Sequence, residues 1–174
     1  MCVYAPTRLY RLALAGLFIG TFLPFGLLRA ADESVAEQTV SGELDGLDFA
    51  GTLRSADGSI SLDDTLHFRG GHFWSSGCVK CSFMPGAYWT RRVGPTIEFT
   101  GVLESPERGR FTYKGSVNNG EVQVSIHWLR ARWYWTMERD YAYVGRLNTA
   151  EPAGNTLQQA RSRAAGEASP TCPL

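Results

Sequence analysis

A short pattern, aromatic-x-Gly-x-aliphatic, occurs four times and constrains the fold more than any other feature of the chain. In a strand, the aromatic residue, the glycine and the aliphatic residue point to the same face. A glycine in mid-strand loses packing, so its repetition indicates strongly coiled strands or room for a bulky neighbour. Glycines placed by chance at bulges are the alternative. The copies are FAGTL at 49–53, FTGVL at 99–103, YKGSV at 113–117 and YVGRL at 143–147.

Alternation of apolar and polar residues around these copies predicts half-buried antiparallel strands, with no convincing helix between them. Asn119 and Gly120 predict a tight hairpin turn, because this pair accepts positive φ. Since the glycine pattern occurs in the first and last strands, we expect these to pair. An all-β, up-and-down barrel of about eight strands follows. The predicted strands are 47–54, 60–68, 72–76, 88–93, 97–103, 111–117, 121–128 and 141–147.

The strand positions and one cysteine also form a characteristic run, which reads Leu47-x-Phe49-x-Gly51, Leu66-x-Phe68, Phe73, Cys78, Ile97-x-Phe99 and Tyr143-x-Gly145-x-Leu147. Over most of residues 44–147, this run resembles small exported bacterial proteins of unknown function with a lipocalin-like barrel. The resemblance implies a fold and a compartment. It implies no activity.

The first thirty residues predict a signal peptide. Arg8 and Arg11 precede an uncharged apolar stretch at 12–28, and cleavage after Ala30 fits the usual small-residue pattern. An uncleaved membrane anchor is the alternative, although Pro24 weakens a helix in that stretch. We therefore expect a periplasmic or secreted protein with no stable membrane insertion after cleavage.

Removal of the predicted signal peptide changes the charge of the chain. It leaves 14 basic against 17 acidic residues, a net charge of −3, because Arg8, Arg11 and Arg29 are lost. Sequence-independent binding to nucleic acid depends on an excess of Lys and Arg that neutralises phosphates. The mature chain is therefore not expected to bind nucleic acid.

The C-terminal segment 148–174 is rich in Ala, Gly, Ser, Gln and Pro, with few large apolar residues. Such a composition buries too little apolar surface to offset the entropy of ordering, which predicts a disordered tail in which residues 156–165 could form a transient helix. The expected organisation is a signal peptide at 1–30, a polar lead-in at 31–43, the barrel domain at 44–147 and the tail.

Three cysteines remain after cleavage: Cys78, Cys81 and Cys172. In an exported protein, the default expectation is a disulfide. A Cys78–Cys81 bridge would staple a loop at the barrel rim, although the other pairings with Cys172 stay open. A thioredoxin-like redox site is disfavoured, since such a site needs the pair at a helix N-terminus in a βαβ unit.

His67 and His72, with Cys78 and Cys81, form a set whose side chains suit zinc or copper. The spacing matches no zinc finger, and a disulfide would remove both sulfur ligands. We therefore expect no metal and interpret both histidines as rim or surface residues.

The densest aromatic and cationic stretch is WLRARWYW at 128–135. Its members Trp128, Arg132 and Trp133 are candidate ligand contacts, because Trp presents a flat amphipathic surface and Arg stacks on it or binds carboxylate or phosphate. Packing in the core and against side chains of neighbouring strands is the preferred alternative, since aromatic side chains in strands chiefly supply packing area.

Catalysis finds no support in the sequence. A Ser-His-Asp set could be drawn from many residues, but no Gly-x-Ser-x-Gly motif is present, and the adjacent acids Asp63 and Asp64 point to opposite faces of a strand. We therefore expect no enzyme, no catalytic residues and no cofactor.

The leading hypothesis is a non-enzymatic exported protein that binds a small apolar or amphipathic ligand. Eight-stranded barrels accommodate one small ligand, which would be lined here by Phe49, Phe99, Tyr113 and Tyr143. The alternative is an envelope protein-interaction or inhibitor module with a filled core, a disulfide-stapled rim loop and an unknown protein partner. The volume of the side chains inside the barrel separates the two hypotheses.

Overall fold

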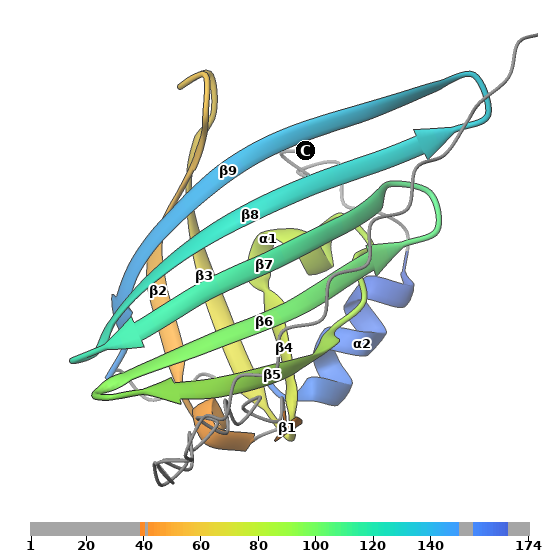
Figure 1. Cartoon of the computed structure of the whole chain (residues 1–174). Helices are drawn as coiled ribbons and strands as arrows, with labels where there is room; N and C mark the ends of the chain where they lie inside the picture. The colour runs from red at the N-terminus through yellow and green to blue at the C-terminus, as the bar shows by residue number, and fades with distance from the viewer. Residues whose placement is uncertain (1–38, 41, 150–154, 167–174) are drawn as a thin grey trace, which may run out of the picture. The chain divides into compact units, whose positions relative to one another are not determined.

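The computed structural model describes residues 39–40, 42–149 and 155–166, so the predicted signal peptide lies outside the described residues. The described part is almost entirely β (Figure 1). Its elements are β1 (Thr39–Val40), η1 (Gly42–Leu44), β2 (Asp48–Ser55), β3 (Ser61–Arg69), β4 (His72–Ser75), α1 (Ser76–Lys80), β5 (Gly86–Val93), β6 (Thr96–Ser105), β7 (Gly109–Asn118), β8 (Glu121–Arg132), β9 (Trp135–Leu147) and α2 (Leu157–Ala165).

Strands β2 to β9 close into a ring of eight antiparallel strands. Each strand pairs with the next along the chain, and β9 pairs with β2 so that Gly51 lies opposite Gly145. The predicted pairing of the first and last strands is therefore confirmed. The short β1 adds to β5 outside this ring.

The glycines of the repeated pattern make room for side chains and backbone. A Cβ atom at Gly101 would lie 2.4 Å from the ring of Phe73, and one at Gly115 would lie 2.4 Å from the ring of Phe99. At Gly51 a Cβ atom would lie 2.2 Å from the carbonyl oxygen of Val144. Real Cβ atoms do not approach other atoms this closely, so the predicted role of these glycines as spaces for bulky neighbours is confirmed.

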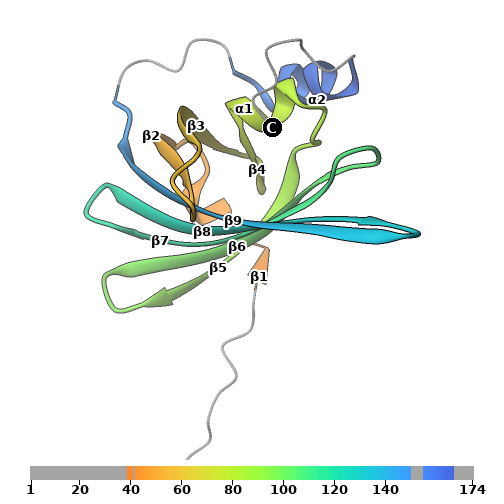
Figure 2. The ribbon, with the colours of Figure 1, turned by 90° about the horizontal axis from the view of Figure 1, so that it is seen from above.

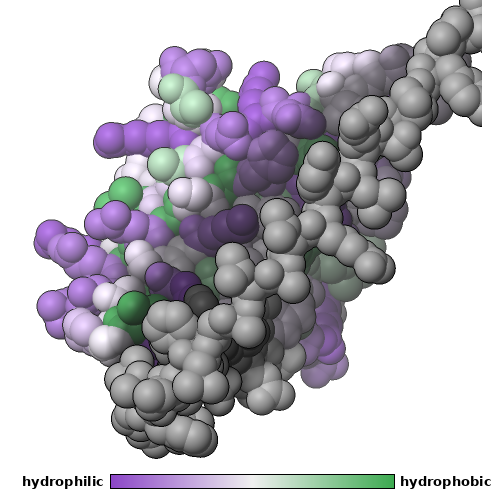
Figure 3. Space-filling model, in the orientation of Figure 1, coloured by the Kyte–Doolittle hydropathy of each residue, from purple (hydrophilic) through white to green (hydrophobic). Residues whose placement is uncertain are grey.

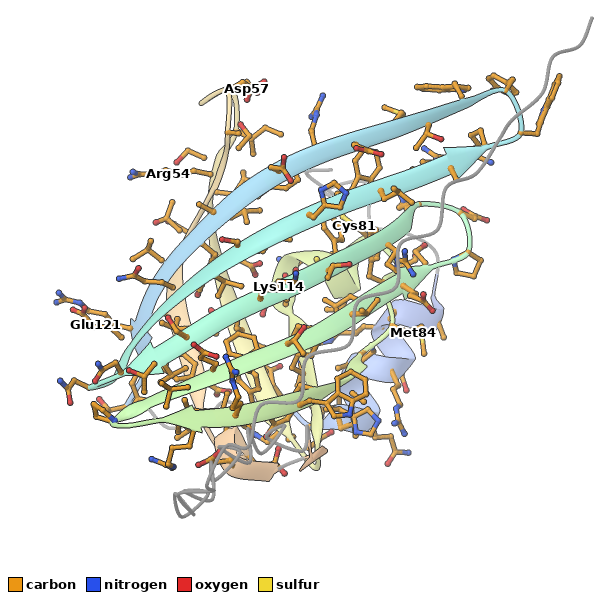
Figure 4. The ribbon with its side chains drawn as sticks, viewed as in Figure 1. Arg54, Asp57, Cys81, Met84, Lys114 and Glu121 are labelled. Carbon is orange, nitrogen blue, oxygen red and sulfur yellow. The ribbon has the colours of Figure 1, made fainter. Side chains whose placement is uncertain are left out.

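The predicted hairpin turn between β7 and β8 is also confirmed. Asn119 and Gly120 have φ values of 49° and 76°, the left-handed conformation that a tight turn of this kind requires. Glu121, labelled in Figure 4, follows this turn and begins β8. The turn fixes the register in which Val122 pairs with Val117.

The core of the ring is aromatic. Phe68 sits at its centre and makes edge-to-face contacts with Phe99, at 5.2 Å between ring centroids, and with Tyr88, at 5.1 Å. Phe73 contacts Tyr113 in the same geometry at 5.1 Å. Edge-to-face pairs stabilise a core beyond their buried area, because the positive edge of one ring meets the negative face of the next.

Helix α2 corrects the prediction of a disordered tail for residues 157–165, while 150–154 and 167–174 lie outside the described residues. Thr156 caps the helix in a reciprocal capping box with Gln159. Ala160 and Ala164, four residues apart, are buried against Trp74 and a residue of α1. Small alanines let a helix approach a neighbouring surface closely, so this segment is ordered despite its low apolar content. Figure 2 shows α1 and α2 side by side.

No helix within the described residues has the length and apolar character that a membrane crossing requires.

Candidate functional site

The four aromatic residues predicted to line a ligand site lie inside the ring. Phe49, Phe99, Tyr113 and Tyr143 are all buried, with at most 4% of their surface exposed. The Tyr143 hydroxyl donates to the carbonyl oxygen of Phe49 at 2.7 Å. These side chains belong to the packed core, and Phe49, Phe99 and Tyr113 contact other buried aromatic rings.

The cavity that adjoins Tyr113 inside the ring is small. A cavity of about 30 Å³ lies between Leu53, Cys78, Tyr113 and Ile126, with Asp64 and Ser75 on its polar side. Pockets for small molecules usually measure about 300–1,000 Å³, whereas about 10–15 Å³ already holds one water molecule. The cavity suits water and is too small for a ligand of ordinary size.

Asp64 organises the polar side of this cavity. Its carboxylate accepts from the Ser75 hydroxyl at 2.5 Å and from the backbone N–H groups of Gly77 and Thr65 at 2.9 and 2.8 Å. Burial raises the pKa of Asp64, while these three hydrogen bonds act in the opposite direction. The carboxyl group thereby holds the start of α1 against β3.

The cysteines correct the predicted Cys78–Cys81 bridge. Cys78 is a free, buried thiol, with its sulfur 3.3 Å from the Tyr113 hydroxyl. Burial raises the pKa of Cys78 to about 12, which makes it an unreactive thiol. Cys81, in contrast, is disulfide-bonded. The bridge fails because α1 turns the Cys78 side chain into the ring, and Cys2 and Cys172 lie outside the described residues.

The two histidines of the metal hypothesis form hydrogen bonds with different partners and do not converge on one site. His67, expected at the rim, is instead buried, with its Nδ1 3.0 Å from Asp48 and its Nε2 2.8 Å from the Ser76 hydroxyl. His72 is bonded through Nδ1 to the carbonyl oxygen of Gly70 at 2.9 Å. Within the described ranges, no three potential ligands gather into a metal site.

An open depression of about 650 Å³ crosses the outer face of β5 to β9. Lys114, labelled in Figure 4, belongs to it, as do Arg91 and Glu98, which form an ion pair with a nitrogen–oxygen distance of 2.5 Å. Figure 3 shows this face as mostly hydrophilic, with isolated hydrophobic residues. Its charged groups partly neutralise each other, and the surface is that of an ordinary solvated sheet.

Strands β8 and β9 run on beyond their neighbours in the ring. The pairing of β8 with β7 ends at Leu129, and the pairing of β9 with β2 ends at Tyr141. Past these points β8 and β9 pair only with each other, as far as Arg132 opposite Trp135. We call residues 130–137 the β8–β9 tip, and Figure 1 shows it projecting past the turn between β6 and β7.

The apex of the tip is aromatic and exposed. Trp133 exposes 94% of its surface, Tyr134 62% and Trp135 46%. The three rings contact one another, with centroids 4.8 Å apart for Trp133 and Tyr134 and 6.0 Å apart for Tyr134 and Trp135. Trp133 is thus a surface residue, whereas Trp128, further down β8, is half-buried against Phe111.

Charges are segregated between the two faces of the projecting hairpin. Alternation along β8 and β9 places one set of side chains on the continuation of the ring's inner face. This arginine–aromatic face consists of Trp128, Arg130, Arg132, Trp135, Met137 and Arg139. The opposite face carries His127, Glu138 and Asp140, of which His127 and Asp140 are 2.8 Å apart.

The base of the hairpin is anchored to the turn between β6 and β7. The Trp128 indole N–H donates to the carbonyl oxygen of Arg108 at 2.9 Å, and Arg132 donates to that of Glu107 at 3.3 Å. Both bonds go to backbone atoms of a neighbouring hairpin. The tip is therefore held in position while its apex stays exposed.

Comparison with known proteins gives no significant match to a family model, a curated protein or a solved structure.

Among the predicted ligand contacts, the structure places Arg132 and Trp133 at the exposed end of the hairpin, Trp128 half-buried against Phe111, and the other four aromatic residues inside the ring. The stretch 128–135 singled out in the sequence includes Arg130, Tyr134 and Trp135, whereas Met137 and Arg139 were missed. Extending the period-two alternation of 121–128 to residue 132 would have placed the arginines on one face.

Proposed function

We propose that the protein is an exported binding protein and that its β8–β9 tip docks on an anionic lipid surface. The observation that carries this proposal is the exposed Trp-Tyr-Trp apex on the hairpin end at 127–140, whose three arginines lie on one face. A ligand inside the ring is not favoured, because side chains fill that space.

The chemistry of the tip suits a lipid–water interface. Trp and Tyr prefer this zone, since an apolar ring and a polar N–H or O–H group are satisfied there together. Arg130, Arg132 and Arg139 would attract anionic headgroups, each contributing about 1 kcal/mol near the surface. Docking of this kind is peripheral and leaves the ring in water.

The dimensions of the tip agree with shallow insertion. Three residue pairs and a two-residue turn lie beyond the ring, which corresponds to about 10 Å at the rise of a strand. Interfacial elements bury their apolar side about 5–10 Å deep. Trp133 would then enter the layer while Arg139 stays at headgroup level.

A convex apex favours lipid over a protein partner. Binding hot spots between proteins usually lie at the centre of a broad patch, surrounded by contacts that exclude water. The apex is narrow, and the other face of the hairpin carries Glu138 and Asp140. A deformable layer accepts such a shape without a preformed pocket.

The proposal includes the class of the fold and the compartment of the protein. The closed ring of eight strands and the packed aromatic core support a lipocalin-like up-and-down barrel with a filled interior. The apolar stretch at 12–28 supports export to the periplasm or the outside, where the tip would meet a membrane surface.

Vesicle flotation tests the proposal. Processed protein, whose mass shows that residues 1–30 are gone, is floated with phosphatidylglycerol-containing vesicles and with pure phosphatidylcholine vesicles. We expect binding to the anionic vesicles that weakens with salt. The double variant Trp133→Ser/Trp135→Ser should bind at least tenfold more weakly, and Arg132→Gln about fivefold more weakly.

Matched variants control for general changes in polarity and charge. Val144→Ser removes an exposed apolar side chain from the outer face of β9, and Arg146→Gln removes an exposed arginine at the far end of the hairpin. Both should bind vesicles like the wild type. Lipid docking is refuted if the processed protein does not float with anionic vesicles or if the tryptophan variant floats equally well. A protein partner would then be the remaining ligand of the tip.

A further inference from the structure

A continuous hydrogen-bonded chain links a serine, a histidine and an aspartate on the outer side of the ring. Asp48 of β2 and His67 of β3 are direct cross-strand partners, and Ser76 begins α1 just after β4. The Ser76 hydroxyl is 2.8 Å from His67 Nε2, and His67 Nδ1 is 3.0 Å from the Asp48 carboxylate. These atoms and distances are those of a nucleophile, a general base and the group that orients the base.

The surroundings fix the orientation of His67. Its ring stacks on Trp74 with 5.3 Å between centroids and 24° between planes. Arg69 lies 2.9 Å from the Asp48 carboxylate and holds it in place. Because that carboxylate accepts the Nδ1–H proton, the hydrogen-bond network assigns the lone pair to Nε2, which faces the Ser76 hydroxyl.

Burial lowers the pKa of His67, against the raising effect of Asp48, so the imidazole is a neutral proton acceptor at neutral pH. The charged or titratable groups around it are Asp48, Arg69 and Asp64.

Ser76 is accessible from solvent. It is half-buried and borders an open groove of about 470 Å³ on the outer side of β2 and β3. Asp63 and Asp64 also line the groove. The Asp64 carboxylate is held by Ser75, Gly77 and Thr65, so the exposed Asp63 carboxylate is the one that would repel an anionic substrate and accept a neutral or cationic one. The remaining lining residues are Ala50, Gly51, Thr52 and Thr65.

We propose that Ser76 is an activated nucleophile that accepts acyl groups from small neutral or cationic esters. In this step, a bond forms between Ser76 Oγ and the carbonyl carbon, and the ester C–O bond breaks. The hydroxyl proton passes to His67 Nε2 and from there to the oxygen of the leaving alcohol. Asp48 acts as a positioning residue. This activity is independent of the docking proposed for the β8–β9 tip.

Acyl transfer at this site should be slow. Backbone N–H groups at a helix start often stabilise the oxyanion, but here that of Gly77 donates to Asp64 and that of Cys78 to Ser75. Loss of one oxyanion donor costs about 10²–10³ in rate. We therefore expect covalent labelling to be easier to detect than turnover.

A fluorophosphonate probe tests the nucleophile without a known substrate. On reaction, the Oγ–P bond forms, the P–F bond breaks, fluoride leaves, and the proton reaches water through His67. We expect one label on the folded protein, mapped to Ser76 by peptide mass spectrometry. Urea-unfolded protein should lose at least tenfold in labelling rate, and Ser76→Ala should lose the label, whereas Ser125→Ala, an exposed serine on β8, should keep it.

The pH profile of labelling separates activation from mere exposure and does not depend on any variant folding. The rate should be flat near neutral pH and fall on acidification below the ordinary histidine pKa of 6.5, because protonated His67 cannot take the proton. Asp48→Asn should lower the rate at least tenfold and alter this profile. An unlabelled wild type, a label at another residue, or a rate that follows hydroxide concentration without a plateau would overturn the proposal.

Discussion

The ring interior and the β8–β9 tip are built from the same residue types, yet they hold them in opposite environments. Phe68, Phe73 and Phe99 are at most 4% exposed, and Phe99 packs edge to face with both of the others, whereas Trp133 at the tip is 94% exposed. Both regions continue the same inner face of alternating strands. The difference arises where β8 and β9 outrun their neighbours, because side chains beyond that point have no opposite wall to meet.

This contrast assigns different roles to the two sets of aromatic residues. Buried rings contribute to the free energy of folding through the apolar surface they remove from water. An exposed cluster contributes little to folding and stays available to another surface. Substitutions inside the ring should therefore unfold the protein, and substitutions at the tip should leave it folded.

The largest effect is expected inside the ring. Phe99→Ala should lower the free energy of unfolding by about 3–5 kcal/mol, because it removes a ring at the centre of the core and leaves a cavity. Urea denaturation followed by circular dichroism measures the change. Val144→Ala, on the outer face, should change stability by less than about 0.5 kcal/mol. Equal losses of stability in the two variants would contradict the distinction between the ring interior and the exposed residues.

Removal of the Cys81 disulfide should cause the next largest loss in the free energy of unfolding. Cys78 is a free thiol, and Ser82 donates to the carbonyl oxygen of Gly166 at 3.3 Å, so the end of α2 lies near Cys81. We expect Cys172, six residues further along the chain, to be the partner of Cys81. Cys172→Ser should cost about 2–4 kcal/mol.

Non-reducing peptide mapping provides the direct measurement. It should give a linked peptide that contains Cys81 and Cys172. A linked Cys78 peptide would show that the assignment is wrong. Native protein should leave Cys78 unmodified by iodoacetamide, because burial raises its pKa to about 12.

Adding a methyl group inside the ring should destabilise the protein somewhat less than removing the disulfide does. Gly115→Ala places a Cβ atom 2.4 Å from the Phe99 ring, and overpacking of this kind costs about 1–3 kcal/mol. Gly77→Ala is the matched control, since its Cβ atom would lie 3.5 Å or more from Asp64. Thermal unfolding of the two variants should separate them, and a stable Gly115→Ala protein would show that the core adapts.

A smaller, pH-dependent effect is expected at His67. Its pKa is lowered in the folded state, so below the ordinary value of 6.5 the unfolded chain binds a proton that the folded chain does not. Stability contributed by neutral His67 is therefore lost as pH falls. Asp64, with its raised pKa, acts in the opposite direction.

Comparison with His67→Gln isolates this contribution. Between pH 7.5 and 5, chosen to span the ordinary pKa, the wild type should lose more stability in urea than the variant does. If the stability of the wild type and of the variant changes with pH in the same way, His67 is not the cause of the loss.

The smallest effect on folding is expected at the tip. Trp133→Ser should change the midpoint of urea unfolding very little, by less than about 0.5 kcal/mol in free energy, because its side chain has almost no buried surface to lose. Flotation with anionic vesicles should fall in the same sample. A destabilisation above about 1 kcal/mol would place Trp133 in the folded core and undo the division between the two regions.

The strands were predictable because their evidence is local. Alternation and the Asn119–Gly120 turn specify each hairpin, and the paired glycines Gly51 and Gly145 indicate where the ring closes. Helix α2 was expected only as a transient helix at 156–165, because its order depends on Trp74, more than eighty residues earlier, and not on its own composition.

The candidate sites were only partly predictable. The sequence identified Trp128, Arg132 and Trp133 as a group, but alternation within one strand does not say where neighbouring strands stop, and that alone exposes the tip. Ser76, His67 and Asp48 meet through the register of β2 against β3 and the start of α1. A one-residue shift of that register would turn His67 to the other face.

Closure of the ring by β2 and β9 sets an order on folding. Phe49 and Leu147 are neighbours across this seam although almost the whole domain separates them in sequence. The other contacts of the ring join successive hairpins, so they can form while the chain is still being delivered, but the seam must wait for the final strand. Until then, both edges of the sheet remain open to mispairing, and the aromatic interior stays accessible to other chains.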